Sequence, residues 1–360
     1  MKMFSFKKLA CAVLSAALII GNMVACSGSG NASDGDKISV VTTIFPEYDY
    51  VREIAKGADN IDVTMLLDNG VDLHSFQPTV DDIAKISVCD VFIYVGGESD
   101  GWVDDALSEA VNKDMVVINL LEVLGDSVKE EEMVEGMEGH DHEHEHEHEE
   151  GEEHEHEEGE EHDHEEGEEH EHEHEHEEGE VEYDEHVWLS LKSTKVICQA
   201  IEKALEKVDS ENAKLYSDNL TAYTNKLDKL DKEYESAVAS AKVNTILFGD
   251  RFPFRYMVDD YGLSYYAAFV GCSAESEASF ETITFLAGKV DELGLTTILQ
   301  IESADGKIAN TIKENTKTKD QEILTLDSMQ SVTSEDVKNG ATYLGIMEEN
   351  LKVLKKALGL

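Results

Sequence analysis

Two histidines lie in settings that suit a metal ligand. His74 occurs in the segment DLHSFQP, directly after the apolar run Ile61–Leu67, and His186 occurs in DEHVWL, before a helical stretch that starts near Ser193. In open α/β sheets, ligands bind at the carboxyl ends of the strands, so His74 stands where a site would form. Neutral imidazole is a preferred ligand of zinc, copper and nickel. Both residues are therefore candidate metal ligands, with ordinary surface or core histidines as the alternative.

All the other histidines lie in one tract, residues 139–180, which consists almost entirely of His, Glu, Asp and Gly. The tract has no apolar residues for a core, so we expect a disordered loop. Imidazoles with neighbouring carboxylates attract metal ions, which predicts several accessory sites of low selectivity. The accessory ligands would be His140, His142, His144, His146, His148, His154, His156, His162, His164, His170, His172, His174 and His176.

The elements that must position these residues follow an alternating pattern. In the first half of the chain, the predicted strands are Ile38–Phe45, Ile61–Leu67, Val91–Val95 and Met115–Leu120, and the predicted helices are Tyr48–Ala55, Val80–Ile86 and Val103–Val111. In the second half, the predicted strands are Thr245–Phe248, Ser264–Val270, Thr297–Ile301 and Glu322–Leu326, and the predicted helices are Phe254–Tyr261, Phe280–Leu293, Ile308–Glu314 and Ser334–Leu358. Alternation of this kind predicts two α/β lobes, each a parallel sheet flanked by helices.

Between the two series, residues 210–241 carry apolar side chains at helical spacings of three and four. The stripe comprises Tyr216, Leu220, Tyr223, Leu227, Leu230 and Tyr234. It predicts one helix of roughly 45 Å, long enough to pack against both lobes. The alternative is that the stripe forms the seam of a coiled-coil dimer. We expect a first lobe at 37–190 that contains the tract, a helical region at 191–242 and a second lobe at 243–360.

The start of the chain has the features of a signal peptide over residues 1–25, with lysines followed by an apolar run, Leu9–Ile20, that is too short to span a bilayer. The run closes on VAC, which is similar to the lipobox of bacterial lipoproteins. Cys26 is therefore the expected lipidation site, and residues 26–36 are the expected flexible linker. A lipid at this end would anchor the protein to the outer face of the cell membrane.

Charge and cysteine content exclude some classes of function. The formal net charge of −50 argues against nucleic acid as a partner, because phosphate binding needs a basic surface. Beyond the expected anchor, the cysteines are Cys89, Cys198 and Cys272, and they show no CxxC spacing. An odd number of this kind argues against a disulfide framework and against a structural zinc site made of thiolates.

The segments DLHSFQPT and DEHVWLSL resemble the paired histidine motifs, HxFxP and DPHxW, of the substrate-binding proteins of bacterial zinc and manganese ABC importers. The acidic His-rich insert, the long linking helix and the closing stretch Tyr343–Leu358 are also similar to that family. The resemblance covers essentially the whole mature chain. It implies two lobes joined by a rigid helix, one metal ion in the cleft between them, and the membrane permease of an ABC importer as partner.

The resemblance further implies that His74 and His186 hold the ion together with two residues of the second lobe. Zinc-type members usually place a third histidine in a stretch that ends in YGL, but this chain reads FGDRFPFRY there, without a histidine. Asp250 is the nearest acceptable ligand, although it could instead cap a helix, and Asp327 matches the position of the family's carboxylate. Glu47 or a tract histidine could substitute for either. Two histidines with two carboxylates suit manganese as well as zinc.

The sequence thus predicts a monomeric, extracytoplasmic receptor that captures zinc and delivers it to an ABC importer, without a catalytic role. A manganese-specific binding protein of the same family is one alternative. A surface metal buffer or adhesin, which would need the tract but not His74 and His186, is another. A metallohydrolase would need an open metal position and a general base, for which Glu185 is the sequence-adjacent candidate.

Overall fold

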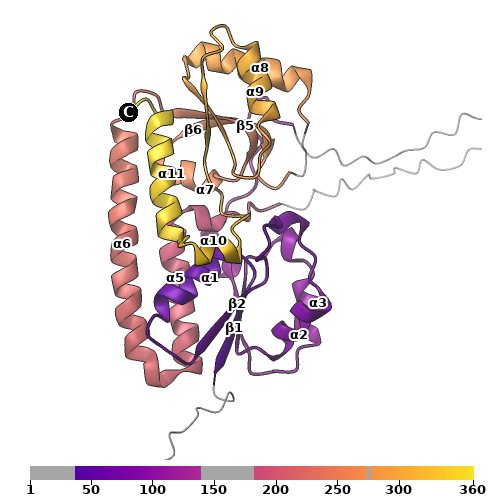
Figure 1. Cartoon of the computed structure of the whole chain (residues 1–360), viewed down its shortest axis with the longest axis vertical. Helices are drawn as coiled ribbons and strands as arrows, with labels where there is room; N and C mark the ends of the chain where they lie inside the picture. The colour runs from indigo at the N-terminus through magenta and orange to yellow at the C-terminus, as the bar shows by residue number, and fades with distance from the viewer. Residues whose placement is uncertain (1–36, 139–181, 274–276) are drawn as a thin grey trace, which may run out of the picture. The chain divides into compact units, whose positions relative to one another are not determined.

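The computed structural model describes residues 37–138, 182–273 and 277–360 (Figure 1). The expected signal peptide, the lipidation site Cys26 and the His-rich tract lie outside these residues. Within the described ranges, no helix is both long and apolar enough to cross a membrane.

The first lobe is built on a parallel sheet with strand order β2-β1-β3-β4. Its strands are β1 (Ile38–Thr42), β2 (Ile61–Met65), β3 (Val91–Tyr94) and β4 (Val116–Asn119), and the intervening helices are α1 (Phe45–Ile54), α2 (Val80–Val88), α3 (Val103–Ser108) and α4 (Leu120–Leu124). Strand β3, with the sequence VFIY, is buried along its whole length. A central strand covered on both faces needs such a continuous apolar run.

The second lobe repeats this arrangement with the order β6-β5-β7-β8, again all parallel. Its elements are β5 (Thr245–Phe252), α7 (Arg255–Tyr261), β6 (Ser264–Val270), α8 (Phe280–Leu293), β7 (Thr297–Gln300), α9 (Lys307–Asn315) and β8 (Glu322–Thr325). The register of β5 against β6 shifts between Phe248 and Arg251. Irregularities of this type change the direction of the side chains around them, here at the end of β5 that carries Asp250 and Arg251.

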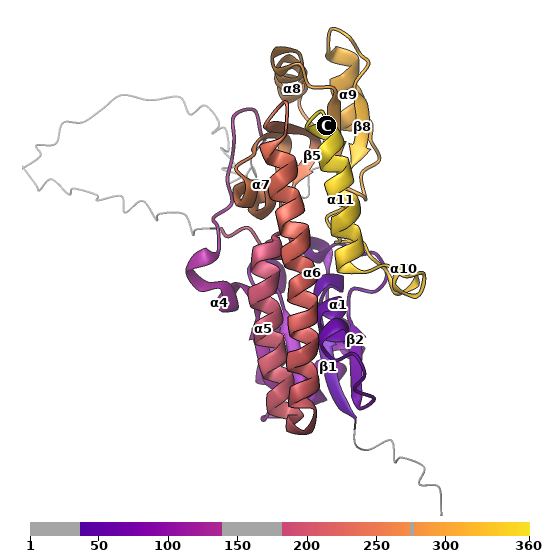
Figure 2. The ribbon, with the colours of Figure 1, turned by 90° about the vertical axis from the view of Figure 1, so that its left-hand side faces the viewer.

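Two long helices, α5 (Leu191–Val208) and α6 (Ala213–Ala239), connect the lobes. Helix α6 has 27 residues, or about 40 Å of length. It packs against α5, against α1 of the first lobe, and against α7 and α11 (Tyr343–Ala357) of the second (Figure 2). The predicted long helix is therefore confirmed, although a short 3-10 turn, Ser210–Asn212, precedes it. Most of its predicted apolar stripe is buried within the chain itself.

The single terminal helix predicted over Ser334–Leu358 is wrong, because the structure has two helices, α10 (Ser334–Lys338) and α11 (Tyr343–Ala357). Between them, Gly340 has a φ angle of 100°, a conformation that is strained for residues with a Cβ. The Thr342 side chain then caps α11 by accepting a hydrogen bond from the Gly345 N–H. A glycine followed by a capping threonine indicates that one helix ends and another begins. The apolar spacing continues across both helices, so it does not reveal this break.

Candidate metal centre

His74 lies in a short 3-10 helix, Leu73–Ser75, beyond the carboxyl end of β2. The Asp72 side chain caps this turn, accepting a hydrogen bond from the His74 N–H at 3.0 Å. The imidazole is largely buried, with 9% of the side chain exposed. The turn therefore fixes both the main chain and the direction of the ring, as the predicted position at a strand end requires.

His186 directly precedes a second 3-10 helix, Val187–Leu189, and its side chain is fully buried. Asp184 contacts His186 at two points through the same carboxylate oxygen, Oδ1. The His186 main-chain N–H donates to this oxygen at 2.9 Å, and the ring nitrogen Nδ1 lies 3.0 Å from it. The ring also packs against Trp188, with 5.3 Å between ring centroids. A carboxylate on one ring nitrogen orients the other and increases its basicity, which is the arrangement of metal-bound histidines.

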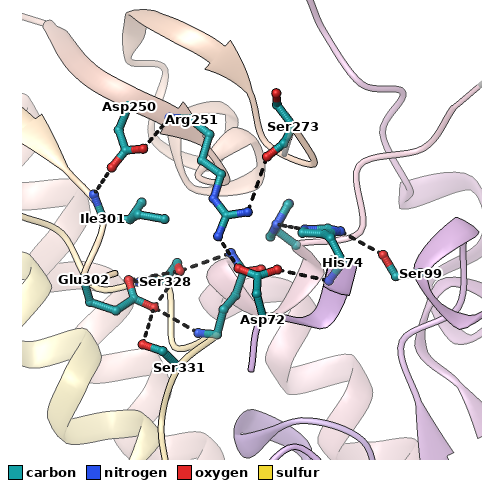
Figure 3. A network of polar contacts seen from close by, with 12 residues as sticks. Asp72, His74, Ser99, Asp250, Arg251, Ser273, Ile301, Glu302, Ser328 and Ser331 are labelled. Carbon is teal, nitrogen blue, oxygen red and sulfur yellow. Dashed lines mark hydrogen bonds and ion pairs between the residues drawn. The ribbon is translucent and has the colours of Figure 1, made fainter. Parts of the chain in front are cut away.

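The two predicted histidines meet, with 3.1 Å between their Nε2 atoms. On the opposite side of its ring, His74 Nδ1 lies 2.8 Å from Ser99 Oγ and 3.5 Å from Glu185 Oε2. Figure 3 shows His74 with Ser99 on one side and Asp72 beneath. Each ring is thus held through Nδ1 and turns Nε2 toward the other ring. Two imidazole nitrogens bound to one tetrahedral zinc would be about 3.3 Å apart.

A third metal-ligating atom lies beside this pair. Among the described residues, the group of His, Cys, Asp and Glu side chains that could hold an ion together is His74, His186 and Cys272, whose ligand atoms lie within 4.8 Å of one another. Cys272 follows β6 and has a free thiol, and burial raises the pKa of that thiol. No sequence signal marks it, because it has no CxxC partner and the fold alone brings it to the histidines.

Asp250, predicted as a ligand, lies in β5 and is occupied by main-chain groups. Its Oδ1 accepts from the Arg251 N–H at 2.9 Å, and its Oδ2 accepts from the Ile301 N–H at 3.0 Å. It is not part of the described three-residue group, and burial raises the pKa of its carboxyl group. It lines a cavity of about 470 Å³ that also contacts Asp72 and Ser75 of the first lobe, so the cavity lies in the cleft between the lobes.

Asp327, the other predicted carboxylate ligand, follows β8. Its Oδ1 accepts from the Met329 N–H at 2.8 Å, and burial together with the nearby Glu302 raises its pKa to about 7. Glu302 itself accepts from the main-chain N–H groups of Ser328 and Gln330. Asp327 also lies outside the described group of three, so its role as a ligand, like that of Asp250, stays a prediction.

Glu47, the alternative ligand, is fully buried at the start of α1. Its Oε2 accepts hydrogen bonds from the N–H groups of Thr43 and Ile44 at 2.9 and 3.2 Å, so it caps the helix. Burial, and then the charge of Asp100, raise the pKa of its carboxyl group well above the usual value. The accessory tract histidines, the other alternative, lie outside the described residues.

Arg251 links the two lobes beside the histidines. Its guanidinium pairs with Asp72, which caps the His74 turn, and also donates to the Ser273 carbonyl oxygen at 3.5 Å. Figure 3 shows Arg251 extending from β5 toward Asp72, with Ser273 near the same guanidinium. The cation thus ties the loop that carries His74 to the segment that directly follows Cys272.

We expect the Asp184→Asn variant to bind zinc about 10 to 100 times more weakly than the wild type, because loss of this carboxylate reduces the basicity of His186, the predicted ligand. Asp231→Asn is a matched control, since Asp231 is also a buried aspartate, but pairs with Lys195 on α5. Competition with a chromophoric chelator measures both affinities. Equal affinities in the two variants would contradict the role assigned to Asp184.

Comparisons with known proteins place this geometry in context. A family model described as "Zinc-uptake complex component A periplasmic" matches residues 40–357. The high-affinity zinc uptake system protein ZnuA of Bacillus subtilis is 30% identical over 340 residues, which are 93% of this chain and 93% of that protein. The zinc-binding lipoprotein AdcA of Streptococcus pneumoniae is 30% identical over 344 residues, 96% of this chain and 60% of that protein.

Among solved structures, the Zn(II)-bound ZnuA-like domain of Streptococcus pneumoniae AdcA is similar, with a TM-score of 0.64 and 25% identity. That likeness covers 90% of this chain and 100% of the domain. The chain spans a little more than half the length of the AdcA relatives, 56% in the Streptococcus pyogenes protein. The two-lobed α/β architecture and the long helix are therefore shared with this group.

Proposed function

The chain belongs to the zinc-uptake complex component A family, and we propose that it is an extracytoplasmic receptor that binds zinc for delivery to the permease of an ABC importer. The observation that carries this proposal is the pairing of His74 and His186, whose Nε2 atoms lie 3.1 Å apart. Each ring is oriented through Nδ1, by Ser99 or by Asp184. Zinc between the two Nε2 atoms would replace their mutual contact with two strong bonds.

We infer a binding role rather than a catalytic one. Glu185 is the residue that a hydrolase would need as a base, but its Oε1 accepts from the Ser99 N–H at 2.9 Å and its Oε2 lies beside His74 Nδ1. The carboxylate therefore lies on the Nδ1 side of His74, away from the side of the ring where the metal would bind. Asp250 and Asp327 stay predicted ligands from the second lobe.

We propose that the His-rich tract collects metal ions at low selectivity and passes them to the paired histidines. Support comes from the described residues at its two ends. The Glu138 N–H donates to the Ala268 carbonyl oxygen on β6, and the Glu131 N–H donates to the Glu182 carbonyl oxygen, each at 2.9 Å. The last described residue before the tract, Glu138, therefore contacts β6 four residues before Cys272, and the first described residue after it, Glu182, lies four residues before His186.

The lipid anchor at Cys26 also belongs to this proposal. The Streptococcus pneumoniae relative is named as a lipoprotein, and a lipid-modified N-terminus would keep a receptor near its permease while the folded part stays in water. We propose a monomer, since the apolar stripe of α6 is largely buried within one chain.

Calorimetric titration tests the proposal, using protein in which a short glycine-serine linker replaces residues 139–180. We expect one tight zinc site, lost in the His74→Ala, His186→Ala double variant, whereas protein that keeps the tract should bind several further equivalents. A parallel manganese titration tests the choice of metal, because preference for manganese would change the cargo. If the double variant kept the tight site, the receptor proposal would be wrong.

A further inference from the structure

We propose that the Cys272 thiolate is the third protein ligand of the metal bound by His74 and His186. This inference rests on the proposed zinc-binding function and specifies the chemistry of the same site. The three ligand atoms come from three separate segments of the chain and lie within 4.8 Å of one another. On binding, the thiol proton is released to water and a zinc–sulfur bond forms.

The distances suit tetrahedral zinc. With zinc–nitrogen bonds of about 2.0–2.1 Å and a zinc–sulfur bond of about 2.3 Å, a nitrogen and a sulfur on the same ion are about 3.6 Å apart. The observed ligand atoms lie within 4.8 Å of one another, so the sulfur would need to move by no more than about 1.2 Å. Rotation about χ1 of a cysteine moves its sulfur over distances of this size.

The main chain before Cys272 is built for a close approach to His186. A Cβ atom at Gly271 would lie 2.9 Å from the Phe252 carbonyl oxygen and 3.1 Å from His186 Cε1. Any larger residue would push this segment away from the imidazole, so glycine is what brings the cysteine within reach of the histidine.

Hydrogen bonds then hold Cys272 in place. Its N–H donates to Glu131 Oε1 at 3.2 Å, and the Glu185 main chain is a hydrogen-bond partner of its thiol. The next residue, Ser273, is bound through its carbonyl oxygen by Arg251, which also pairs with Asp72 at the His74 turn. The polar network that positions His74 therefore extends to the cysteine segment (Figure 3).

The other two described cysteines differ from Cys272 in both position and surroundings. Cys89 and Cys198 are fully buried in the apolar core, and the Cys89 thiol donates to the Ile86 carbonyl oxygen. Neither joins a group of metal-ligating side chains in the described ranges. They are core residues, and they provide matched controls for a thiol-specific experiment.

A thiolate also bears on which metal the site prefers. Two histidines and two carboxylates would suit manganese and zinc alike, but sulfur is a soft ligand that favours zinc and cobalt over manganese. With Cys272 as a ligand, the ordered site would favour zinc over manganese, as the imidazoles of the His-rich tract do.

Cobalt(II) spectroscopy tests the proposal on the protein that begins at Lys37, where the described fold starts. A thiolate bound to cobalt gives a sulfur-to-metal charge-transfer band in the near ultraviolet, whereas the tract contains no cysteine and cannot give one. We expect the band in the wild type and in Cys198→Ala, and its loss in Cys272→Ser. Zinc affinity in Cys272→Ser should fall by more than about 100-fold. This loss exceeds that expected for removing a residue that only hydrogen-bonds to a metal ligand.

A second measurement needs no variant. Zinc should slow alkylation of Cys272 by iodoacetamide in the wild-type protein, as read by peptide mass spectrometry, while magnesium should not. Tight zinc binding without the band or this protection would overturn the cysteine proposal and leave the receptor function intact. Failure of His74→Ala, His186→Ala to change the tight zinc site would instead overturn the receptor function, and the cysteine proposal with it.

Discussion

The Trp188→Ala variant is expected to lose about 3–5 kcal/mol of unfolding free energy, the usual cost of removing a buried tryptophan. Trp188 is fully buried, and its Nε1–H donates to the Ser328 carbonyl oxygen at 2.9 Å. Its own carbonyl oxygen accepts from the Tyr343 hydroxyl at 2.7 Å. The side chain therefore joins the loop of His186 to the segment after β8, and a cavity here would loosen both.

Urea unfolding followed by circular dichroism measures this loss. Trp188→Phe is the matched control, because it keeps a ring beside His186 but leaves the Ser328 oxygen without its donor, at a cost of about 1–3 kcal/mol. We expect zinc affinity to fall in the alanine variant and to change less in the phenylalanine variant. An alanine variant within about 1 kcal/mol of wild type would show that the loop is not held by this packing.

The Asp49→Asn variant is expected to be more stable than wild type at pH 7, by about 1–3 kcal/mol. Asp49 is 2% exposed, and burial raises its pKa from 3.8 to about 6. Its Oδ2 accepts from the Tyr343 N–H at 2.8 Å at the start of α11, and an asparagine oxygen can accept the same bond. The substitution therefore removes a buried charge and keeps the hydrogen bond.

The pH dependence of the stability difference tests whether the buried charge of Asp49 is its cause. Between about pH 4 and pH 6 the folded wild type holds a proton on Asp49 that the unfolded chain has released, so this residue lowers stability as pH rises through that range. Asparagine does not titrate, so the stability difference between variant and wild type should be small at pH 4, grow up to about pH 6 and then stay constant. Urea midpoints at several pH values measure it, and a difference independent of pH would reject the explanation.

The sheets and the linking helix could be predicted because their signals are local. The strand Ser264–Val270 and the helix Phe280–Leu293 have the predicted bounds, since each is an apolar run with turn residues on both sides. The predicted strand Thr245–Phe248 is shorter than β5, which continues to Phe252 through the register shift. Such an irregularity depends on the neighbouring strand and leaves no periodic signal in one sequence.

The candidate site was predictable in part for the same reason. His74 and His186 stand at recognisable element ends, and the structure brings their rings together. Cys272 could not be found, because its nearness to His186 depends on the path of the chain through Gly271. In the stretch after Phe248, the sequence predicted Asp250 as a second-lobe ligand. In the structure, the neighbouring residue Arg251 forms an ion pair with Asp72.

The wide spacing of the paired residues along the chain has a consequence for the lifetime of the protein. His74 and His186 are 112 residues apart, so an unfolded chain does not bring these two ligands together. Metal that binds only the folded state adds RT ln(1 + [L]/Kd) to its stability, about 4 kcal/mol at a thousandfold excess over Kd. If the proposed zinc site forms, loaded molecules would therefore resist proteases longer than empty ones, and the surviving amount of the protein would itself reflect the zinc supply.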